Sequence, residues 1–112
     1  MAYQKVGKPK MSIKKKSLPG LFELRQTLQQ LEEDLGMGEL HDIDRLILEF
    51  IGFCEAKGRL IVSTQIEHEP MFASVSRPTI YRSPKRLREQ KRIVYETDVH
   101  DGRVRYVFPA KV

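Results

Sequence analysis

Leucines at helical spacing mark the first regular element of this chain. Over about residues 20–35 they follow one another at intervals that alternate between three and four, which places them along one seam of a helix. They are Leu21, Leu24, Leu28, Leu31 and Leu35. Gly36 and Gly38 are expected to end the helix. The seam is too short for an independent coiled coil, so it packs either on its own domain or, as we favour, on a second copy of the chain.

A second amphipathic helix is predicted over about residues 43–57. Apolar side chains repeat there at i, i+3, i+4 and i+7, the spacing of a buried helix face. They are Ile43, Leu46, Ile47, Phe50, Ile51 and Cys54. Asp42 is expected to cap the start of this helix, and Gly58 to follow its end. We expect the helix to form the core, with Cys54, the single cysteine, as a buried structural thiol.

The pattern after the second helix consists of short elements. The short run 59–62 is predicted to be extended, as a third strand that pairs with a hairpin near the end of the chain. Ser63 or Thr64 is expected to cap a short helix, with Glu67 completing a capping box. Pro70 either ends or kinks that helix.

The last third of the chain begins with a basic helix, predicted over about residues 77–90. Ser76 is expected to be its N-cap, and Pro78 is tolerated in its first turn. Pro84 falls inside the helix and removes one backbone hydrogen bond. Either the helix is kinked there or a second piece starts after Ser83, and we favour the kink.

Polar and apolar residues then alternate from Ile93 to Phe108, which predicts two strands. Asp101-Gly102 lies between them and is the strongest short hairpin signal in the chain. The predicted fold class is therefore mainly α with a small β-hairpin, an α+β arrangement.

Charge divides the chain into three blocks. Residues 1–16 carry six lysines and no acid, residues 17–76 carry four basic against eleven acidic residues, and residues 77–112 carry ten basic against four acidic ones. We expect a flexible basic arm over residues 1–17 and a single domain over residues 18–112. A basic face on an acidic domain is typical of a protein that binds nucleic acid. The plainer alternative is that these blocks are solvated surface.

A basic helix followed at once by a basic hairpin suits duplex DNA, with the helix in the major groove and the hairpin on the backbone or in the minor groove. The candidate DNA-binding residues are Ser76, Arg77, Thr79, Tyr81, Arg82, Lys85, Arg86, Arg88, Arg103 and Arg105. Those in the first two turns are expected to read bases. Those from Lys85 onward are expected mainly to meet phosphates, and Arg103 can enter the minor groove.

The order of these elements resembles the winged helix-turn-helix of bacterial transcription factors, and residues 40–109 are most similar to MarR-like regulators. The run 75–82 resembles that family's Ser-x-x-Thr-Val-x-Arg start of the recognition helix. The run 85–93 is similar to its pattern before the wing, and Asp101-Gly102-Arg103 to its Asp-x-Arg wing tip. The resemblance implies a DNA-binding transcription regulator of the bacterial cytoplasm, associated with the nucleoid.

Three features depart from the family's pattern. Lys91 stands where glycine is usual, which puts a non-glycine at a left-handed turn position. Pro84 interrupts the recognition helix. The chain also stops after the wing, as if truncated, whereas MarR-like proteins continue into helices that complete a dimer and shape a ligand pocket. Neither that dimer nor small-molecule induction is therefore carried over. The leucine seam is left as the candidate homodimer interface, through Leu21, Leu24, Leu28 and Leu31.

The sequence offers no residue set for catalysis, a metal or a cofactor. One cysteine and the scattered His41, His68 and His100 lack the spacing of a zinc site, and no phosphate loop or nucleophile elbow is present. No apolar run reaches the roughly 18 residues of a membrane span. We expect a non-enzymatic protein whose partners are double-stranded DNA and its own copy. Two alternatives remain: a protein-interaction module, and an RNA-binding or replication accessory protein.

Overall fold

The computed structural model describes residues 17–111. These residues divide into two compact units, one ending at Glu39 and the other beginning at Leu40. The basic arm expected over residues 1–17 lies outside the described residues, apart from Ser17. We expected residues 18–112 to form one domain, whereas every element of the helix-turn-helix and its hairpin belongs to the second unit.

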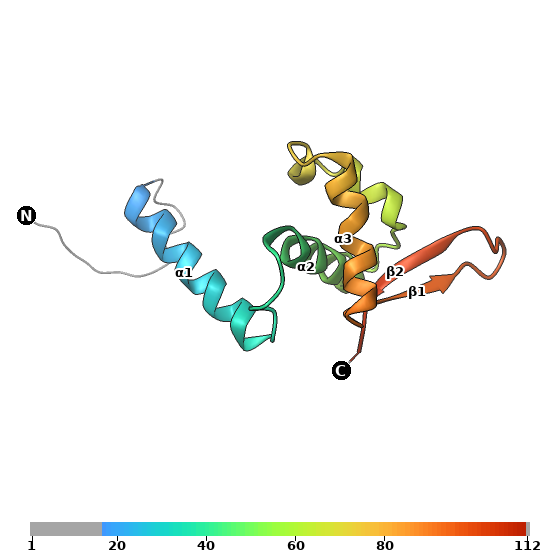
Figure 1. Ribbon diagram of the computed structural model, residues 1–112, viewed down its shortest axis with the longest axis horizontal. Helices are drawn as coiled ribbons and strands as arrows, with labels where there is room; N and C mark the ends of the chain where they lie inside the picture. The colour runs from blue at the N-terminus through green and yellow to red at the C-terminus, as the bar shows by residue number, and fades with distance from the viewer. Residues whose placement is uncertain (1–16, 112) are drawn as a thin grey trace, which may run out of the picture. The chain divides into compact units, whose positions relative to one another are not determined.

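The first unit contains the helix α1 (Leu18–Asp34), blue to cyan in Figure 1. Ser17 caps it, because its hydroxyl oxygen accepts a hydrogen bond from the Gly20 backbone N–H at 3.1 Å. The helix begins two residues before the predicted start, and Leu35 is its C-cap. The leucine spacing therefore predicted the helix correctly, and the other four seam leucines lie within it.

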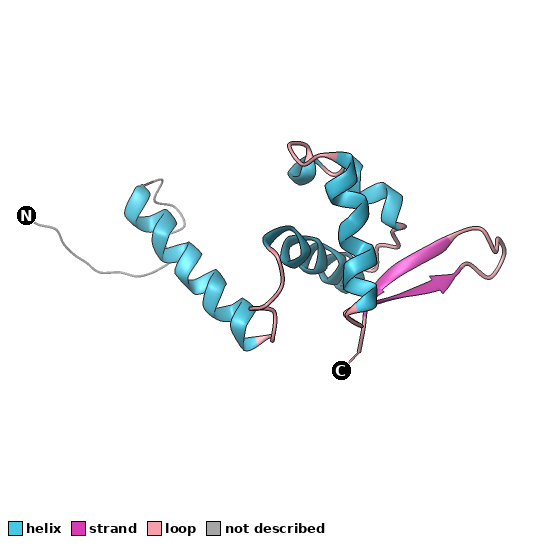
Figure 2. Cartoon of the chain, in the orientation of Figure 1, coloured by secondary structure: helices cyan, strands magenta, loops and turns pink. Residues whose placement is uncertain are grey.

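The second unit holds two helices, two 3₁₀ helices and a hairpin (Figure 1). In chain order they are α2 (Asp42–Ala56), η2 (Ser63–His68), η3 (Pro70–Phe72), α3 (Arg77–Glu89), β1 (Ile93–Thr97) and β2 (Arg105–Pro109). β1 and β2 are antiparallel, and the hairpin extends away from the helices in Figure 2. This is a winged helix, as the sequence predicted.

The core of the second unit takes one face from each element. From α2 it takes Ile47, Phe50, Ile51 and Cys54 as predicted, while Ile43 and Leu46 are only half-buried. The other buried apolar residues are Leu40, Ile61, Ile66, Phe72, Ile80, Leu87, Ile93 and Val107. α3 packs against α2, η2 and β1. Burial raises the pKa of the Cys54 thiol, as expected for a structural cysteine.

Two predicted helix caps are wrong. Asp42 is the first residue of α2 rather than its cap, and its carboxylate pairs with Arg45 one turn later. At η2 the N-cap is Val62, whose backbone N–H donates to Oε1 of Gln65 at 2.9 Å. The predicted capping box of Thr64 and Glu67 is therefore not formed. As a result, the Glu67 carboxylate makes contacts elsewhere.

The expected third strand at residues 59–62 is reduced to a single bridge. Val62 pairs with Tyr106, and the Val107 N–H donates to the Ile61 carbonyl at 2.9 Å. The sheet itself has two strands. This bridge still ties β2 to the segment that follows α2.

Pro84 does not divide α3, the helix that begins after Ser76. α3 is assigned as one helix from Arg77 to Glu89, so the predicted alternative of a second piece starting after Ser83 is wrong. Pro84 is buried against the core together with Ser83. The proline therefore lies on the packed face, and the surface of α3 that faces solvent runs on past it.

The three α-helices end with the same left-handed turn. The backbone φ is 76° at Gly36, 70° at Gly58 and 62° at Lys91. In each case the next residue donates its N–H at 2.8 Å to the carbonyl five positions back, the bond of a Schellman motif. The positive φ predicted for Lys91 is confirmed. Lysine there carries a conformational cost that glycine at the other two ends avoids.

Replacing Lys91 with glycine is therefore expected to raise the free energy of unfolding, by about 1 kcal/mol, the cost of a left-handed L-residue. Urea denaturation measures it. Gly58→Lys is the matched reverse change, and should lower stability by a similar amount, because a Cβ added at Gly58 meets nothing within 4 Å. If neither variant shifts the unfolding midpoint, the two turns do not hold their left-handed conformation in solution.

Candidate nucleic-acid interface

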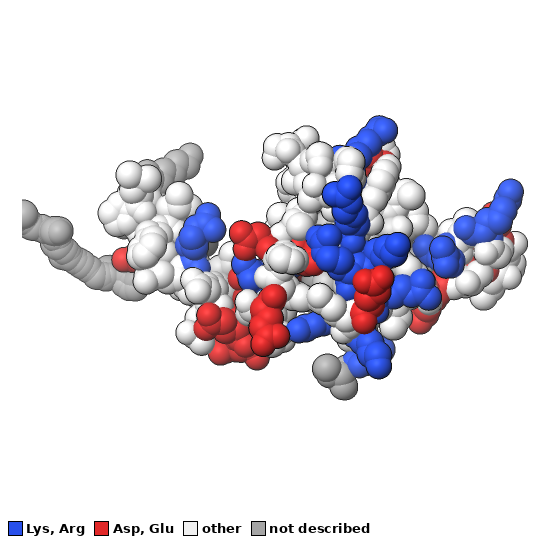
Figure 3. All heavy atoms as spheres, viewed as in Figure 1, with Lys and Arg blue, Asp and Glu red and all other residues white. Residues whose placement is uncertain are grey.

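α3 has one buried and one exposed face. Ile80, Ser83, Pro84 and Leu87 recur at helical spacing and face the core. The exposed positions carry Arg77, Tyr81, Arg82, Lys85 and Arg88. Five of the ten predicted DNA-binding residues therefore share one surface, which we call the α3 face. Figure 3 shows Lys and Arg side chains gathered over α3 and along the hairpin.

A buried ion pair anchors α3 to α2. The Asp44 side chain is fully buried, and Arg86 donates to it from Nε at 3.0 Å and from Nη2 at 2.7 Å. The Ser83 hydroxyl donates to the same carboxylate at 2.5 Å. Burial alone would raise the pKa of Asp44, but the hydrogen bonds from Arg86 and Ser83 outweigh it and hold that pKa below its ordinary value.

This pair changes the role expected of Arg86. Its side chain is 34% exposed, and two of its nitrogens donate to Asp44. We predicted a phosphate contact for it, whereas the structure gives it a partner within the fold. The sequence did not predict this role of Asp44, because an acidic residue in the first turn of a helix is usually exposed to solvent.

Ser76 and Thr79 form the start of α3. The Ser76 hydroxyl accepts the Thr79 backbone N–H at 3.4 Å, and the two hydroxyl oxygens lie 2.8 Å apart. Ser76 is the predicted N-cap, and that prediction is confirmed. Thr79 is half-buried, and its hydroxyl lies beside that of the cap residue.

Glu67 of η2 meets two side chains of the α3 face. The Arg77 Nε lies 2.8 Å from its Oε1, and the Tyr81 hydroxyl donates to its Oε2 at 2.5 Å. His68 Nε2 lies 3.8 Å from Oε2. The hydrogen bond to Glu67 raises the pKa of Tyr81. One carboxylate therefore contacts Arg77 and Tyr81, two of the residues predicted to read bases.

Arg82 and Lys85 are the exposed cations at the centre of the α3 face. Neither makes an ion pair or a side-chain hydrogen bond within residues 17–111. Both can meet a partner without first giving up an internal contact, which distinguishes them from Arg77 and Arg86.

Tyr95 links α3 to the hairpin. The guanidinium of Arg88 lies 4.9 Å from the centre of its ring, and that of Arg105 lies 5.4 Å from it. Such cation–π contacts fix the position of an arginine while leaving its charge accessible. Two predicted phosphate-binding residues, one on α3 and one on β2, are thus brought to the same aromatic ring.

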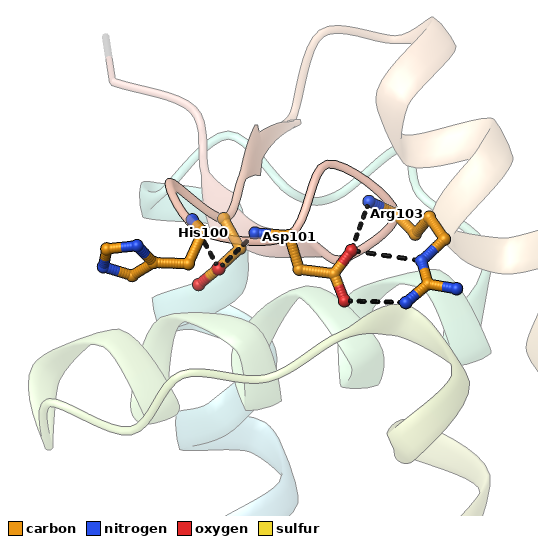
Figure 4. A network of polar contacts seen from close by, with 4 residues as sticks. His100, Asp101 and Arg103 are labelled. Carbon is orange, nitrogen blue, oxygen red and sulfur yellow. Dashed lines mark hydrogen bonds and ion pairs between the residues drawn. The ribbon is translucent and has the colours of Figure 1, made fainter.

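The hairpin loop is wider than the Asp-Gly turn that we predicted. The register from Ile93↔Pro109 to Thr97↔Arg105 leaves residues 98–104 between the strands. Gly102 does not have the positive φ of a tight two-residue turn. Instead, the Asp98 carboxylate accepts the backbone N–H groups of His100 and Asp101, each at 2.9 Å, within the contacts drawn in Figure 4.

Arg103 lies in this loop and not in a strand, so it does not share a strand face with Arg105, which begins β2. Asp101 accepts its backbone N–H at 3.0 Å and its guanidinium at 3.2 and 3.3 Å (Figure 4). Hydrogen bonds from the Arg103 side chain and backbone hold the pKa of Asp101 below its ordinary value. The Arg103 side chain is nevertheless 91% exposed, at the outer end of the hairpin.

No family model matches this chain. No curated protein matches it either. The crystal structure of the adhesin competence repressor from Streptococcus pyogenes is similar to it, with a TM-score of 0.49 and 15% sequence identity, and the match covers 81% of this chain. The chain spans 62% of that structure. The fold assignment rests on the element order and strand register given above.

Other kinds of site find no support in the part of the chain that is described. No group of three or more His, Cys, Asp or Glu side chains within residues 17–111 could hold a metal ion. None of the helices described is both long and apolar enough to cross a membrane. The α3 face and the hairpin are therefore the candidate binding surface of the described residues.

Proposed function

We propose that this protein binds duplex DNA as a transcription regulator, with the α3 face in the major groove and the hairpin on the backbone or in the minor groove. The observation that carries the proposal is the separation of α3 into an apolar buried side and a cationic exposed side. A helix that serves only as structure has no need of Arg77, Arg82, Lys85 and Arg88 on its solvent side. The resemblance of residues 75–82 to the start of the MarR-like recognition helix supports the same proposal.

The proposed division of labour follows the contacts. Arg77, Tyr81 and Arg82 are exposed in the first two turns of α3 and are assigned to base edges, where arginine pairs with guanine N7 and O6. Thr79 can offer its methyl group to thymine, and Ser76 holds the helix start. Lys85, Arg88, Arg103 and Arg105 are assigned to phosphates. Arg86 is given a lesser part, because Asp44 binds it.

A titration separates this function from its alternatives. The full chain is added to labelled duplex DNA, single-stranded DNA and RNA of equal length at one fixed salt concentration. We expect duplex DNA to bind most tightly, with a log–log salt slope of about −0.9 for each phosphate neutralised. Preference for a single strand would support the RNA-binding or replication alternative. Absence of binding to all three would leave the protein-interaction alternative.

We also propose that α1 forms a homodimer interface. Leu21, Leu24, Leu28 and Leu31 are all exposed in the single chain, Leu24 at 43% and Leu28 at 45%. A seam of leucines on a helix surface is most readily buried against its own copy, by a two-fold axis. Two copies would place two recognition helices on a palindrome and multiply specificity.

Light scattering at micromolar concentration should accordingly give the mass of a dimer. Changing both Leu24 and Leu28 to glutamate should give a folded monomer, since two charges then lie at the seam. Gln26→Glu with Gln30→Glu is the matched control, because it adds the same charge at the same spacing off the seam. A monomeric wild type, or a control that dissociates as readily as the seam variant, would contradict the interface.

A further inference from the structure

We propose that Glu67 is a specificity-determining positioning residue: it orients Arg77 and Tyr81 for base readout and weakens binding to DNA of the wrong sequence. The inference rests on the proposed binding of duplex DNA and identifies how the α3 face would discriminate among sequences. Glu67 lies outside α3, and its sequence neighbours do not suggest any part in recognition.

The position of Glu67 is fixed by the fold. η2 packs against α3, and the adjacent Ile66 is fully buried. The Glu67 side chain is only 10% exposed, whereas that of Arg77 is 73% exposed. The carboxylate is thus held at the base of the surface, with the arginine projecting past it. Gln65, rather than Glu67, accepts the N–H of the N-cap residue Val62, so the carboxylate is not needed to cap η2.

The two partners of Glu67 lie one turn apart on α3. A carboxylate that binds both Arg77 and Tyr81 fixes the mutual position of a guanidinium and a phenol, each of which otherwise samples several rotamers. The contact to Arg77 is made by Nε, and bidentate readout of guanine can use the two terminal nitrogens. Holding these side chains before DNA arrives reduces the entropy lost on forming the specific complex.

The same charge acts against non-specific binding. Non-specific affinity comes from attraction between cations and phosphates. Glu67 neutralises part of that attraction at Arg77 and adds a negative charge beside the DNA surface. On the correct sequence, the ordered base contacts offset this loss of attraction to phosphates. On other sequences no base contact offsets it. Glu67 should therefore raise the ratio of specific to non-specific affinity, which a merely structural residue would leave unchanged.

The test begins with a selection. The full-length wild type enriches sites from a randomised duplex library, and affinities are then measured at one salt concentration for an enriched duplex and a scrambled one. Glu67→Gln should tighten binding to the scrambled duplex a few-fold and lower the specificity ratio about tenfold, the low end for one lost bidentate contact. Tyr81→Phe removes the hydroxyl that meets Glu67, the polar group by which Tyr81 itself can reach a base edge, and should lower the ratio in the same direction.

A double-mutant comparison shows whether Glu67 acts through its partners. In a chain that already carries Arg77→Ala and Tyr81→Phe, adding Glu67→Gln should leave the specificity ratio within about twofold, because nothing remains to position. An undiminished effect in that background would mean that Glu67 touches a base itself, and would overturn the proposal. So would a Glu67→Gln protein with the wild-type ratio.

These outcomes separate the inference from the function beneath it. If the wild type enriches no sequence, both the proposed DNA-binding function and the role of Glu67 are contradicted. If the wild type enriches a site and Glu67→Gln binds that site with the same specificity ratio, only the proposed role of Glu67 is contradicted. Tyrosine titration by NMR checks the contact without DNA: the pKa of Tyr81, raised by its hydrogen bond to Glu67, should fall towards the ordinary value in Glu67→Gln. An unmoved Tyr81 pKa would contradict the positioning contact. If Glu67→Gln fails to fold, Glu67→Asp takes its place: it keeps the charge but shortens the side chain that reaches Arg77 and Tyr81, and it should also lower the ratio.

Discussion

Replacing Asp44 with alanine should cost about 3 kcal/mol of the free energy of unfolding, the low end of the range for breaking a buried ion pair. The low end applies because Arg86, left without its partner, is 34% exposed and can be hydrated. The Ser83 hydroxyl also loses its acceptor. Ser83→Ala is the graded comparison and should cost less, since Asp44 and Arg86 still pair. Chemical denaturation measures both variants.

The pH dependence of stability gives a sharper signature of this pair. The pKa of Asp44 is lowered in the folded protein, so its contribution to stability is present above the ordinary carboxyl pKa, about 3.9, and is lost as the pH falls through the folded value. The difference between wild type and Asp44→Ala should therefore be constant from pH 7 to 5 and shrink below about pH 4. A difference that stays constant to pH 3 would show that the pair does not hold Asp44 ionised.

Removing the arginine should reverse the sign. In Arg86→Met, burial of the Asp44 carboxylate is opposed only by Ser83 and His41, so the pKa of Asp44 should rise. Stability should then improve as the pH is lowered through the raised pKa of Asp44, whereas the wild type loses the Asp44 contribution below about pH 4. If this variant loses stability in acid just as the wild type does, the low pKa of Asp44 does not depend on Arg86.

Replacing Arg82 and Lys85 together with alanine should produce the largest loss of DNA binding. Both cations are exposed at the centre of the α3 face and make no internal pair within the described chain. Loss of Arg82 alone should cost about 1–3 kcal/mol on a preferred site and much less on random DNA. Loss of Lys85 should weaken binding to all duplexes and flatten the salt slope by about one unit.

Lys57→Ala is the matched control for the loss of a single cation, because it removes an exposed lysine from the end of α2, where it lies over Phe53. It should leave both the affinity and the salt slope almost unchanged. If Arg82→Ala weakens preferred and random duplexes equally, Arg82 touches only phosphate. A control as severe as the double variant would indicate general charge attraction rather than a defined face.

The sequence was sufficient to predict the three α-helices, the two hairpin strands and the face that α3 exposes. Helical spacing separates Ile80 and Leu87 from the cations between them, and that spacing is local. The positive φ at Lys91 also followed from comparison with a glycine-bearing pattern. The order of helices and hairpin could be predicted for the same reason, since each element carries its own signal within a few residues.

Contacts across the chain could not be predicted in this way. Asp44 binds Ser83 and Arg86, which lie 39 and 42 positions later in the chain. Glu67 binds Tyr81, which lies 14 positions later. Glu67 even carried a misleading local signal, the capping box. The hairpin loop differs for a related reason. The Asp98 carboxylate accepts two backbone N–H groups and so stabilises a seven-residue loop, whereas the Asp-Gly pair alone favoured a tight turn.

Amide chemical shifts recorded while duplex DNA is added test the central claim most directly. We predict that the amides that shift or broaden belong to α3 and to the hairpin, residues 76–89 and 93–109, and that α2 residues on the core face, such as Ile47 and Ile51, stay in place. The same titration with Arg82→Ala plus Lys85→Ala should need far more DNA to reach the same change. Shifts that spare α3, or no shift at any DNA concentration, would contradict the assignment of this surface to duplex DNA.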